Sequence, residues 1–293
     1  MGTVKTLLEY FEELEEFLDD RKKRGFIGEF PVGIKSIDSI TGGLDRGQIM
    51  VIGGAAGSGK TTMAMEMAFK LSLFGKKVLV LSLEMKGSEL LGRLLCNAEQ
   101  IDNVLLREGR SYDPEYKDKV ERFKKKLITA PLDIIEDAGY RFGEIKTILD
   151  KDFVGDNTPD IVFIDFLQLI EWKGSQNEAL VSYLREFQEI AKKRNIAIVV
   201  VSQLRRPMSG QAYDRPPSKY DLLGSGMIEH IAHQIFILYR GLAEGGVKQQ
   251  YIAIEKNRLG RAGDKVVVDF QGQYYSFKDM NTVINEESWR DNV

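Results

Sequence analysis

The most constraining feature of the chain is a glycine-rich segment between an apolar run and a helix-periodic run. Its residues are Gly54, Ala55, Ala56, Gly57, Ser58, Gly59, Lys60, Thr61 and Thr62. Residues 49–52 before it are apolar and rich in β-branched side chains, and residues 61–73 after it repeat with helical spacing. Strand, glycine loop and helix form the context of a phosphate-binding loop.

Such a loop binds phosphate through backbone N–H groups and the positive end of the following helix. We therefore expect an ATP site, with Lys60 reaching the β- and γ-phosphates and the Thr61 hydroxyl ligating Mg²⁺. The alternative is a chance match of two glycines, a lysine and a hydroxyl residue, and the flanking strand and helix patterns disfavour it.

Composition limits the remaining possibilities. The 293 residues allow one large α/β domain or two small ones, and a hydrophobic content of 43% suffices for a sizeable core. The net charge of −3 requires any nucleic acid to contact a local basic surface. The single cysteine, Cys96, excludes an intrachain disulfide framework and a cysteine-based zinc module. Only His230 and His233 could support histidine-based catalysis, which is therefore disfavoured.

No targeting or membrane segment is visible in the sequence. The N-terminal region is acidic and amphipathic and lacks the compact apolar stretch of a signal peptide. No apolar run approaches the ~20 residues of a membrane-spanning helix. We expect a cytoplasmic protein without a membrane partner.

Apolar runs and amphipathic runs alternate along the chain. The predicted strands are 49–52, 77–83, 132–135, 161–164, 196–201, 234–239, 250–255 and 265–270. The predicted helices between them are 61–73, 88–98, 114–127, 142–153 and 179–194. The first part of this order is typical of a parallel sheet flanked by helices, and the helix-poor last part indicates an antiparallel edge. We predict an α/β fold in one domain, residues 31–293, preceded by a helix and linker in residues 1–30.

Residues 4–24 predict one amphipathic helix, with apolar residues at helical spacing and acidic residues on the other face. The basic residues at positions 21–24 complement the helix dipole, and Gly25 ends the helix. A glycine-rich stretch separates this helix from the first core strand. The helix could fold back on its own domain or dock on a neighbouring subunit.

Three predicted strands end in polar residues that suit nucleotide hydrolysis. Asp165 follows 161–164, and parallel strands present such carboxylates toward the phosphate loop, where Asp165 could hold Mg²⁺ through water. Glu84 follows 77–83 and could orient and deprotonate the attacking water. Gln203 follows 196–201 and could sense the γ-phosphate. A strand cap, a solvated acid and an ordinary polar strand end are the alternatives for these three residues.

Two further groups of cations are candidates for phosphate chemistry. A long segment, 204–223, contains Arg205, Arg206, Arg215 and Lys219, and Lys173 lies in another turn. Long loops in compact domains are usually functional, so we expect these cations to contact DNA phosphates, the alternative being a solvated loop. Lys256 and Arg258 end the strand 250–255 and could act on a phosphoryl transition state, in their own or an adjacent subunit, unless they form a surface cluster.

These residues resemble the motifs of the motor domain of DnaB-type replicative DNA helicases, a RecA-like class. The resemblance rests on residues 81–85 with 90 and 93–95, 164–169, 201–204, 225–229 and 256–258, in that order. It covers about residues 30–277. It implies a RecA-like P-loop NTPase fold and a hexameric ring that translocates on single-stranded DNA, with 5′–3′ polarity expected. It also implies Glu84 as catalytic base, Lys256 and Arg258 acting on the adjacent subunit's nucleotide, and 4–24 as a linker helix on the next protomer.

The chain also departs from that family. Only 53 residues precede Gly54, so the family's N-terminal, primase-associated domain is not expected, and the chain is either a fragment or a minimal helicase. A primase or a helicase loader is a possible partner. Family members usually carry acidic residues after Ile228-Glu229, where this chain has His230 to His233.

Two other functions stay open at this point. The 256–260 segment is also close to a motif of RadA-type branch-migration proteins, so a recombination ATPase of the RecA/RadA kind is the alternative. Those proteins carry a zinc module that one cysteine cannot supply. A nucleotide-gated switch or scaffold without motor activity is a third possibility, which Glu84 disfavours.

Overall fold

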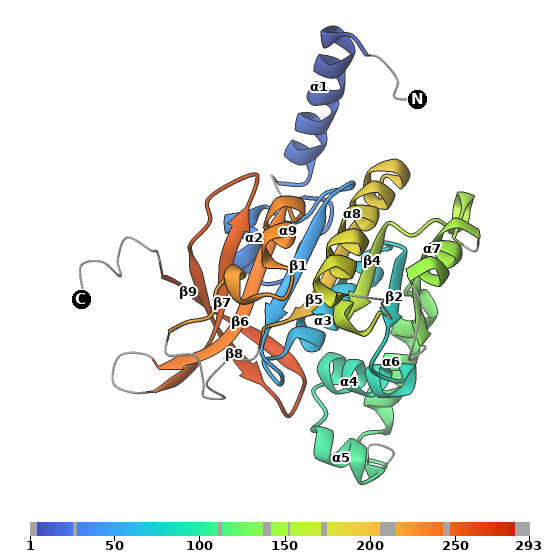
Figure 1. Ribbon diagram of the computed structural model, residues 1–293. Coiled ribbons are helices and arrows are strands. Elements are labelled where there is room, and N and C mark those ends of the chain that lie inside the picture. Colours follow the sequence, from blue (N-terminus) through green and yellow to red (C-terminus); the bar gives the residue numbers. More distant parts are fainter. Residues whose placement is uncertain are drawn as a thin grey trace.

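The structure, a computed structural model, describes residues 5–25, 28–110, 113–136, 142–151, 153–170, 175–205, 215–242 and 247–284. One nine-stranded sheet runs through it in the order β3-β2-β4-β5-β1-β6-β7-β8-β9 (Figure 1). The strands are β1 (Ile49–Gly54), β2 (Val78–Ser82), β3 (Leu132–Glu136), β4 (Ile161–Asp165), β5 (Ala197–Gln203), β6 (Gln234–Leu242), β7 (Lys248–Asn257), β8 (Lys265–Gln271) and β9 (Ser276–Ile284).

The first six strands in this order, from β3 to β6, are parallel to one another, and β7, β8 and β9 extend the sheet antiparallel. The predicted fold class, a mostly parallel sheet with an antiparallel edge, is therefore confirmed. Because the central strands are buried on both faces, their sequences are continuously apolar rather than alternating.

Helices cover both faces of the sheet. On one face α3 (Lys60–Leu73), α4 (Gly87–Glu99) and α6 (Lys117–Thr129) pack on alternate residues of the central strands. On the other face α7 (Phe142–Lys151), α8 (Gln176–Arg194) and α9 (Ser225–Ile231) pack on the residues between those. Figure 1 shows α8 and α9 in front of the strands. Because β1, β2, β4 and β5 are parallel, their C-terminal ends lie together at one end of the sheet.

Sequence periodicity missed the short elements. α2 (Lys35–Thr41) and α5 (Asn103–Arg107) each form about two turns or fewer, too short for a periodic pattern. α9 lies between the segment 204–223 and the strand 234–239, where no element was predicted. β9 was missed because most of its residues are exposed and its sequence is polar. The predicted helix 114–127 begins later, at Lys117, after a turn at residues 114–116.

The N-terminal helix α1 (Leu7–Lys23) stands away from the rest of the molecule (Figure 1). A capping box between Thr6 and Glu9 begins it, and none of its residues is buried. Leu7 is 89% exposed and Phe11 54%, so the apolar stripe of α1 has no partner among the described residues. The expected amphipathic helix is present, but it does not fold back on its own domain.

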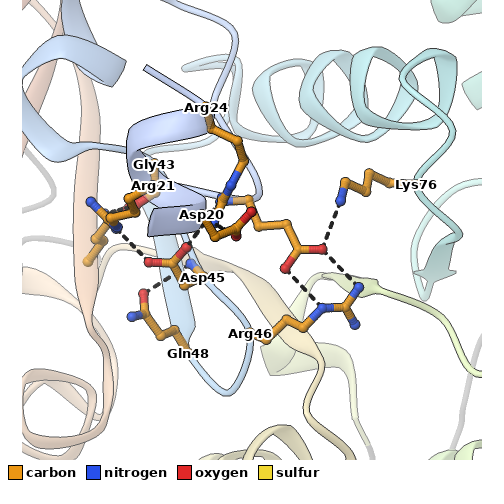
Figure 2. Close-up of polar contacts among 10 residues, drawn as sticks. Asp20, Arg21, Arg24, Gly43, Asp45, Arg46, Gln48 and Lys76 are labelled. Carbon is orange, nitrogen blue, oxygen red and sulfur yellow. Dashed lines mark hydrogen bonds and ion pairs between the residues drawn. The ribbon is translucent and has the colours of Figure 1, made fainter. Parts of the chain in front are cut away.

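Ion pairs hold the base of α1 to the domain (Figure 2). The Arg21 guanidinium lies 2.5 Å from the Asp45 carboxylate, and both side chains are largely buried. Asp45 also accepts the backbone N–H of Glu29 at 3.0 Å, and Arg24 pairs with Asp20. Nearby, Glu29 contacts Arg46 at 2.9 Å and Lys76 at 2.8 Å. The direction of α1 is therefore set mainly through Asp45.

We expect Asp45→Asn to loosen α1 without unfolding the domain. Asparagine keeps an oxygen for the Glu29 N–H group but loses the charge that holds Arg21. Amide exchange in α1 should accelerate by about tenfold, the effect of losing one well-placed charged hydrogen bond. Exchange in the central strands should stay unchanged. Asp19→Asn is the matched control, because its pair with Lys23 is exposed and 3.6 Å long. Equal α1 exchange in the two variants would contradict this role of Asp45.

No helix in the described ranges is long and apolar enough to cross a membrane.

Candidate nucleotide site

The phosphate-binding loop turns between β1 and α3 as predicted. Gly57 and Gly59 adopt φ angles of 74° and 93°, which only glycine reaches without strain. A Cβ atom on Gly59 would also lie 2.6 Å from Cζ of Phe277, so the loop has no room for a side chain there. Gly59 is the N-cap of α3, whose free N–H groups and dipole face the loop.

Lys60 lies within this loop with its ammonium group turned inward. Its side chain is buried, and Nζ donates to the Ala55 carbonyl at 2.8 Å. Burial lowers the pKa of Lys60, while the carboxylates of Asp165 and Glu84 oppose that shift. A phosphate group would replace the carbonyl as a stronger partner for this ammonium.

Asp165 is buried at the end of β4, beside Ser82 of β2. Burial raises its pKa to about 6, Glu84 adds to the shift, and the Thr61 hydroxyl and Lys60 oppose it. Although Thr61 is near enough to affect this pKa, neither carboxylate oxygen makes a hydrogen bond of normal geometry within the described residues. A buried carboxylate without a donor is suited to a cation.

Thr61 and Asp165 therefore fit the Mg²⁺ that was predicted. The described part of the chain has no group of three or more side chains of the His, Cys, Asp and Glu types that could hold a metal. Proteins usually bind Mg²⁺ through one or two carboxylates, water and nucleotide phosphates.

Glu84 and Gln203 complete the same edge of the sheet. Leu83 donates its N–H to the Asp165 carbonyl at 2.8 Å, which places the exposed Glu84 beside the buried carboxylate. Gln203 pairs in register with Gly54, the first residue of the phosphate loop. Gln168, after β4, donates to Ser202 at 2.8 Å and accepts the Gln203 N–H at 3.2 Å, so it fixes the end of β5.

A cleft of about 550 Å³ opens over these groups. The residues lining it are Ala56, Gly57, Gly59, Lys60, Thr61, Thr62, Glu84, Met85, Glu89, Arg93, Asp165, Phe166, Gln203, Phe270, Gly272 and Tyr275. Sequence reasoning missed Phe270 and Tyr275, whose rings could stack on a nucleotide base. It included Arg93 in a family motif but gave it no role in the site; the Arg93 guanidinium lies 5.1 Å from the Tyr275 ring centroid. They come from β8, the following turn and α4, so only the tertiary fold brings them together.

Lys256 and Arg258 lie at the opposite end of the strands from the phosphate loop. Gln234 pairs with both Met50 and Asn257, whereas Gly54 pairs with Leu238. At roughly 3.3 Å per residue, the four residues from Met50 to Gly54 separate the two edges by about 13 Å. Neither cation can therefore reach the phosphate loop of its own chain.

The predicted DNA-binding cations differ in their surroundings. Arg206 and Lys173 lie outside the described residues. Arg205 is exposed. Arg215 forms two hydrogen bonds with Asp221, at 2.7 and 2.8 Å, and Lys219 lies 2.8 Å from Glu229. Arg215 and Lys219 thus belong to intramolecular ion pairs rather than to an open basic surface.

His233 supports the start of β1. Its Nδ1 accepts the Ile49 N–H at 3.1 Å, and its backbone N–H donates to the Ile49 carbonyl at 2.7 Å. Burial lowers the pKa of His233 to about 4, and Arg258 and Lys256 add to the shift. The imidazole is therefore neutral at physiological pH, as its role as an acceptor requires.

This shift predicts a pH dependence of stability. The unfolded chain binds a proton at His233 near pH 6.5, whereas the folded chain resists it until about pH 4, so folding loses free energy as the pH falls through that window. Between pH 7 and pH 5 the free energy of unfolding should fall by about 1–2 kcal/mol because of this group, allowing for its partial exposure. Urea denaturation of wild type and His233→Asn, which keeps an acceptor but does not titrate, measures the difference. Equal pH dependence in both proteins would contradict the assignment.

Known proteins resemble this chain over most of its length. Residues 30–279 match the family described as "DnaB-like helicase C terminal domain". The replicative DNA helicase DnaB of Pasteurella multocida is 27% identical over 288 residues, which cover 94% of this chain and 61% of that protein. A probable plasmid replicative DNA helicase of Chlamydia trachomatis is 30% identical, over 84% of this chain and 54% of the relative. The chain thus spans about 60% or less of the length of these curated relatives.

Solved structures match over nearly the whole chain. One, described as an ATPase domain, superposes with a TM-score of 0.82 and 25% identity, covering 95% of this chain and 100% of that domain. A DnaB-like replicative helicase, whose structure is described with its interactions with primase, gives a TM-score of 0.76 and 25% identity, covering 94% of this chain and 67% of that one.

Proposed function

The chain belongs to the DnaB-like helicase C-terminal domain family, and from this we propose that it is the ATP-hydrolysing motor of a replicative DNA helicase. The observation that carries the proposal is the common cleft of Lys60, Asp165, Glu84 and Gln203, together with the position of Arg258 at the far edge. Because Arg258 lies away from the cleft of its own chain, each cleft lacks one phosphate-binding cation unless a second subunit supplies it.

The proposed hydrolysis uses the residues of one cleft in separate roles. The phosphate loop, residues 54–62, binds the triphosphate through its N–H groups, and Lys60 contacts the β- and γ-phosphates. Thr61 directly and Asp165 through water would hold Mg²⁺, which supplies positive charge where the phosphates accumulate negative charge. Glu84 accepts a proton from the attacking water, and Gln203 contacts the γ-phosphate.

The same arrangement supports a homo-oligomer. Lys256 and Arg258 would enter the cleft of a neighbouring copy, and the exposed apolar stripe of α1 would dock on a copy of this chain. Leu7, Phe11, Leu14 and Leu18 of that stripe are each 47% or more exposed. We propose a closed ring, because a ring satisfies every such interface. The resemblance to DnaB-type helicases implies that the ring is a hexamer. We further propose that the chain has a primase or a helicase loader as a partner. We propose the cytoplasm as its location.

Single-stranded DNA is the proposed track. The 204–223 segment begins directly after Gln203, so a change at the γ-phosphate can reach it. Arg205, Arg206 and Lys173 stay the predicted contacts, whereas Arg215 and Lys219, which were also predicted, are held in ion pairs with Asp221 and Glu229. Binding through these cations should weaken with salt because it uses phosphates. The recombination alternative is not favoured, because the matched family and relatives are replicative helicases.

The test is the ATPase rate with and without single-stranded DNA over a range of protein concentrations, combined with displacement of a labelled strand. The proposal expects stimulation by DNA, activity that rises steeply with concentration, and strand displacement. An oligomeric protein whose ATPase ignores DNA and that displaces no strand would overturn it and favour a nucleotide-gated scaffold.

A further inference from the structure

The end of the 204–223 segment lies directly against the phosphate-loop strand. Leu204 and Leu222 form an antiparallel bridge, so the segment closes beside Gln203. Leu222 is fully buried, and a Cβ on Gly53 would lie 2.6 Å from its Cδ2 atom. The turn that precedes Leu222, Lys219–Asp221, is thus tied to the nucleotide edge of the sheet.

The same turn is held to α9 by Lys219. Its Nζ lies 2.8 Å from Oε1 of Glu229, and its backbone N–H donates to Glu255 at 3.2 Å. The Lys219 side chain is 20% exposed. The hydrogen bond from Lys219 lowers the pKa of the Glu229 carboxyl, which is therefore charged at neutral pH.

The C-terminal end of α9 holds the other two cations. Nζ of Lys256 donates to the Glu229 carbonyl, and a guanidinium nitrogen of Arg258 donates to the His230 carbonyl. Carbonyls at a helix end have no partner within the helix and carry partial negative charge, so they bind cations. Burial lowers the pKa of Lys256 and Arg258 adds to this, while the Glu229 carboxylate opposes it.

Glu229 therefore meets cations from two regions. Its carboxylate binds Lys219, from the segment proposed to contact DNA, and its carbonyl binds Lys256, from the pair proposed to act on the neighbour's nucleotide. α9 has seven residues and buries Ile228 and Ile231 in the core, so it is a short, packed link between the two regions.

We infer that Glu229 is a positioning residue that couples the Lys219–Asp221 turn, at the described end of the 204–223 segment, to Lys256 and Arg258. This inference rests on the proposed function, and it names the route by which DNA at one subunit changes hydrolysis in the next. When the Lys219–Asp221 turn moves, the Lys219 ion pair transmits the displacement to Glu229, and α9 transmits it to both cations. Lys219 accordingly serves as a link to α9 rather than as a DNA contact in this conformation.

The test compares the ATPase rate with and without oligo(dT) for wild type, Glu229→Gln, Lys219→Met and the double variant. Glutamine keeps the backbone carbonyl and loses the charge. We expect Glu229→Gln to lower the ratio of DNA-stimulated to basal rate by about fivefold, the size of one partly exposed ion pair, with an unchanged basal rate and melting temperature. The double variant should lose no more than either single variant, because both break one link.

Glu186→Gln is the matched control, because the 3.1 Å ion pair of Glu186 with Lys146 joins α8 to α7 and involves neither Lys219 nor α9. If wild type is stimulated by DNA and Glu229→Gln is stimulated equally, the inference fails and the proposed function stands. Additive losses in the double variant would show that Glu229 and Lys219 act independently. A basal rate and a melting temperature that fall together would show a structural ion pair only. Either outcome overturns the inference. If wild type itself ignores DNA, the proposed function and the inference fail together.

Discussion

Replacement of Lys60 by alanine is expected to lower ATP hydrolysis by about 10²–10³-fold, the cost of removing one preorganised group that binds charge developing in a transition state. The ammonium of Lys60 is buried in the phosphate loop and rests on the Ala55 carbonyl, with no other cation of the described residues lining the cleft except Arg93. Its loss leaves Asp165 and Glu84 beside the triphosphate without that compensating charge. Steady-state ATPase rates and binding of a fluorescent ATP analogue measure the effect.

Lys70→Ala is the control for this prediction. Lys70 lies on the same helix, α3, and its ammonium contacts the Gly33 carbonyl at 3.0 Å and Glu66 at 2.8 Å, away from the cleft. This variant should keep the wild-type rate. Both variants should melt as cooperatively as wild type, which separates loss of chemistry from loss of fold. A Lys60→Ala protein that hydrolyses ATP at the wild-type rate would contradict the assignment of Lys60 to the β- and γ-phosphates.

The sequence predicted the central sheet well for a physical reason. Strands such as β1, β4 and β5 are buried on both faces, so every residue must be apolar, and the run is visible without a partner. Their polar end residues could also be predicted to meet, because parallel strands end at one edge. The structure places Asp165, Glu84 and Gln203 there.

The remaining site residues could not be read from the chain in the same way. Phe270 and Tyr275 reach the cleft from the antiparallel edge, which enters the site only after β6 to β8 have paired. Their aromatic character would equally suit a core. Likewise, nothing in the sequence indicates that two basic residues of 204–223 form ion pairs, Arg215 with Asp221 and Lys219 with Glu229. Charge composition predicts a basic surface, but pairing depends on tertiary contacts.

The N-terminal helix shows the converse limit. Periodicity predicted α1, yet an amphipathic pattern is the same whether its apolar stripe packs on the same chain or on another. The ion pair between Arg21 and Asp45 decides the direction of α1, and it joins residues 24 positions apart with no periodic relation. The sequence pattern therefore could not predict that the apolar stripe of α1 is held away from its own domain, because this depends on a tertiary contact.

Replacement of Arg258 by alanine is expected to lower hydrolysis by about 10³-fold or more while leaving nucleotide binding intact, as for arginine groups that stabilise a phosphoryl transition state. Arg258 is exposed, and it lies at the sheet edge opposite Lys60, so it cannot serve its own chain. The substitution should therefore impair hydrolysis in the cleft of the neighbouring subunit rather than in the cleft of the subunit that carries it. Binding is measured with a fluorescent ATP analogue and hydrolysis by phosphate release.

Mixing Arg258→Ala with Glu84→Gln tests where the arginine acts. Each variant alone has no complete site, because one lacks the arginine and the other lacks the catalytic base. In a mixed oligomer, the cleft of an Arg258→Ala subunit retains Glu84 and receives Arg258 from its Glu84→Gln neighbour, so that interface should hydrolyse ATP. Activity should therefore rise on mixing and reach a maximum near equal proportions. If both residues acted within one chain, no mixture would be more active than its components, and the assignment of Arg258 to the neighbouring subunit's nucleotide would be wrong.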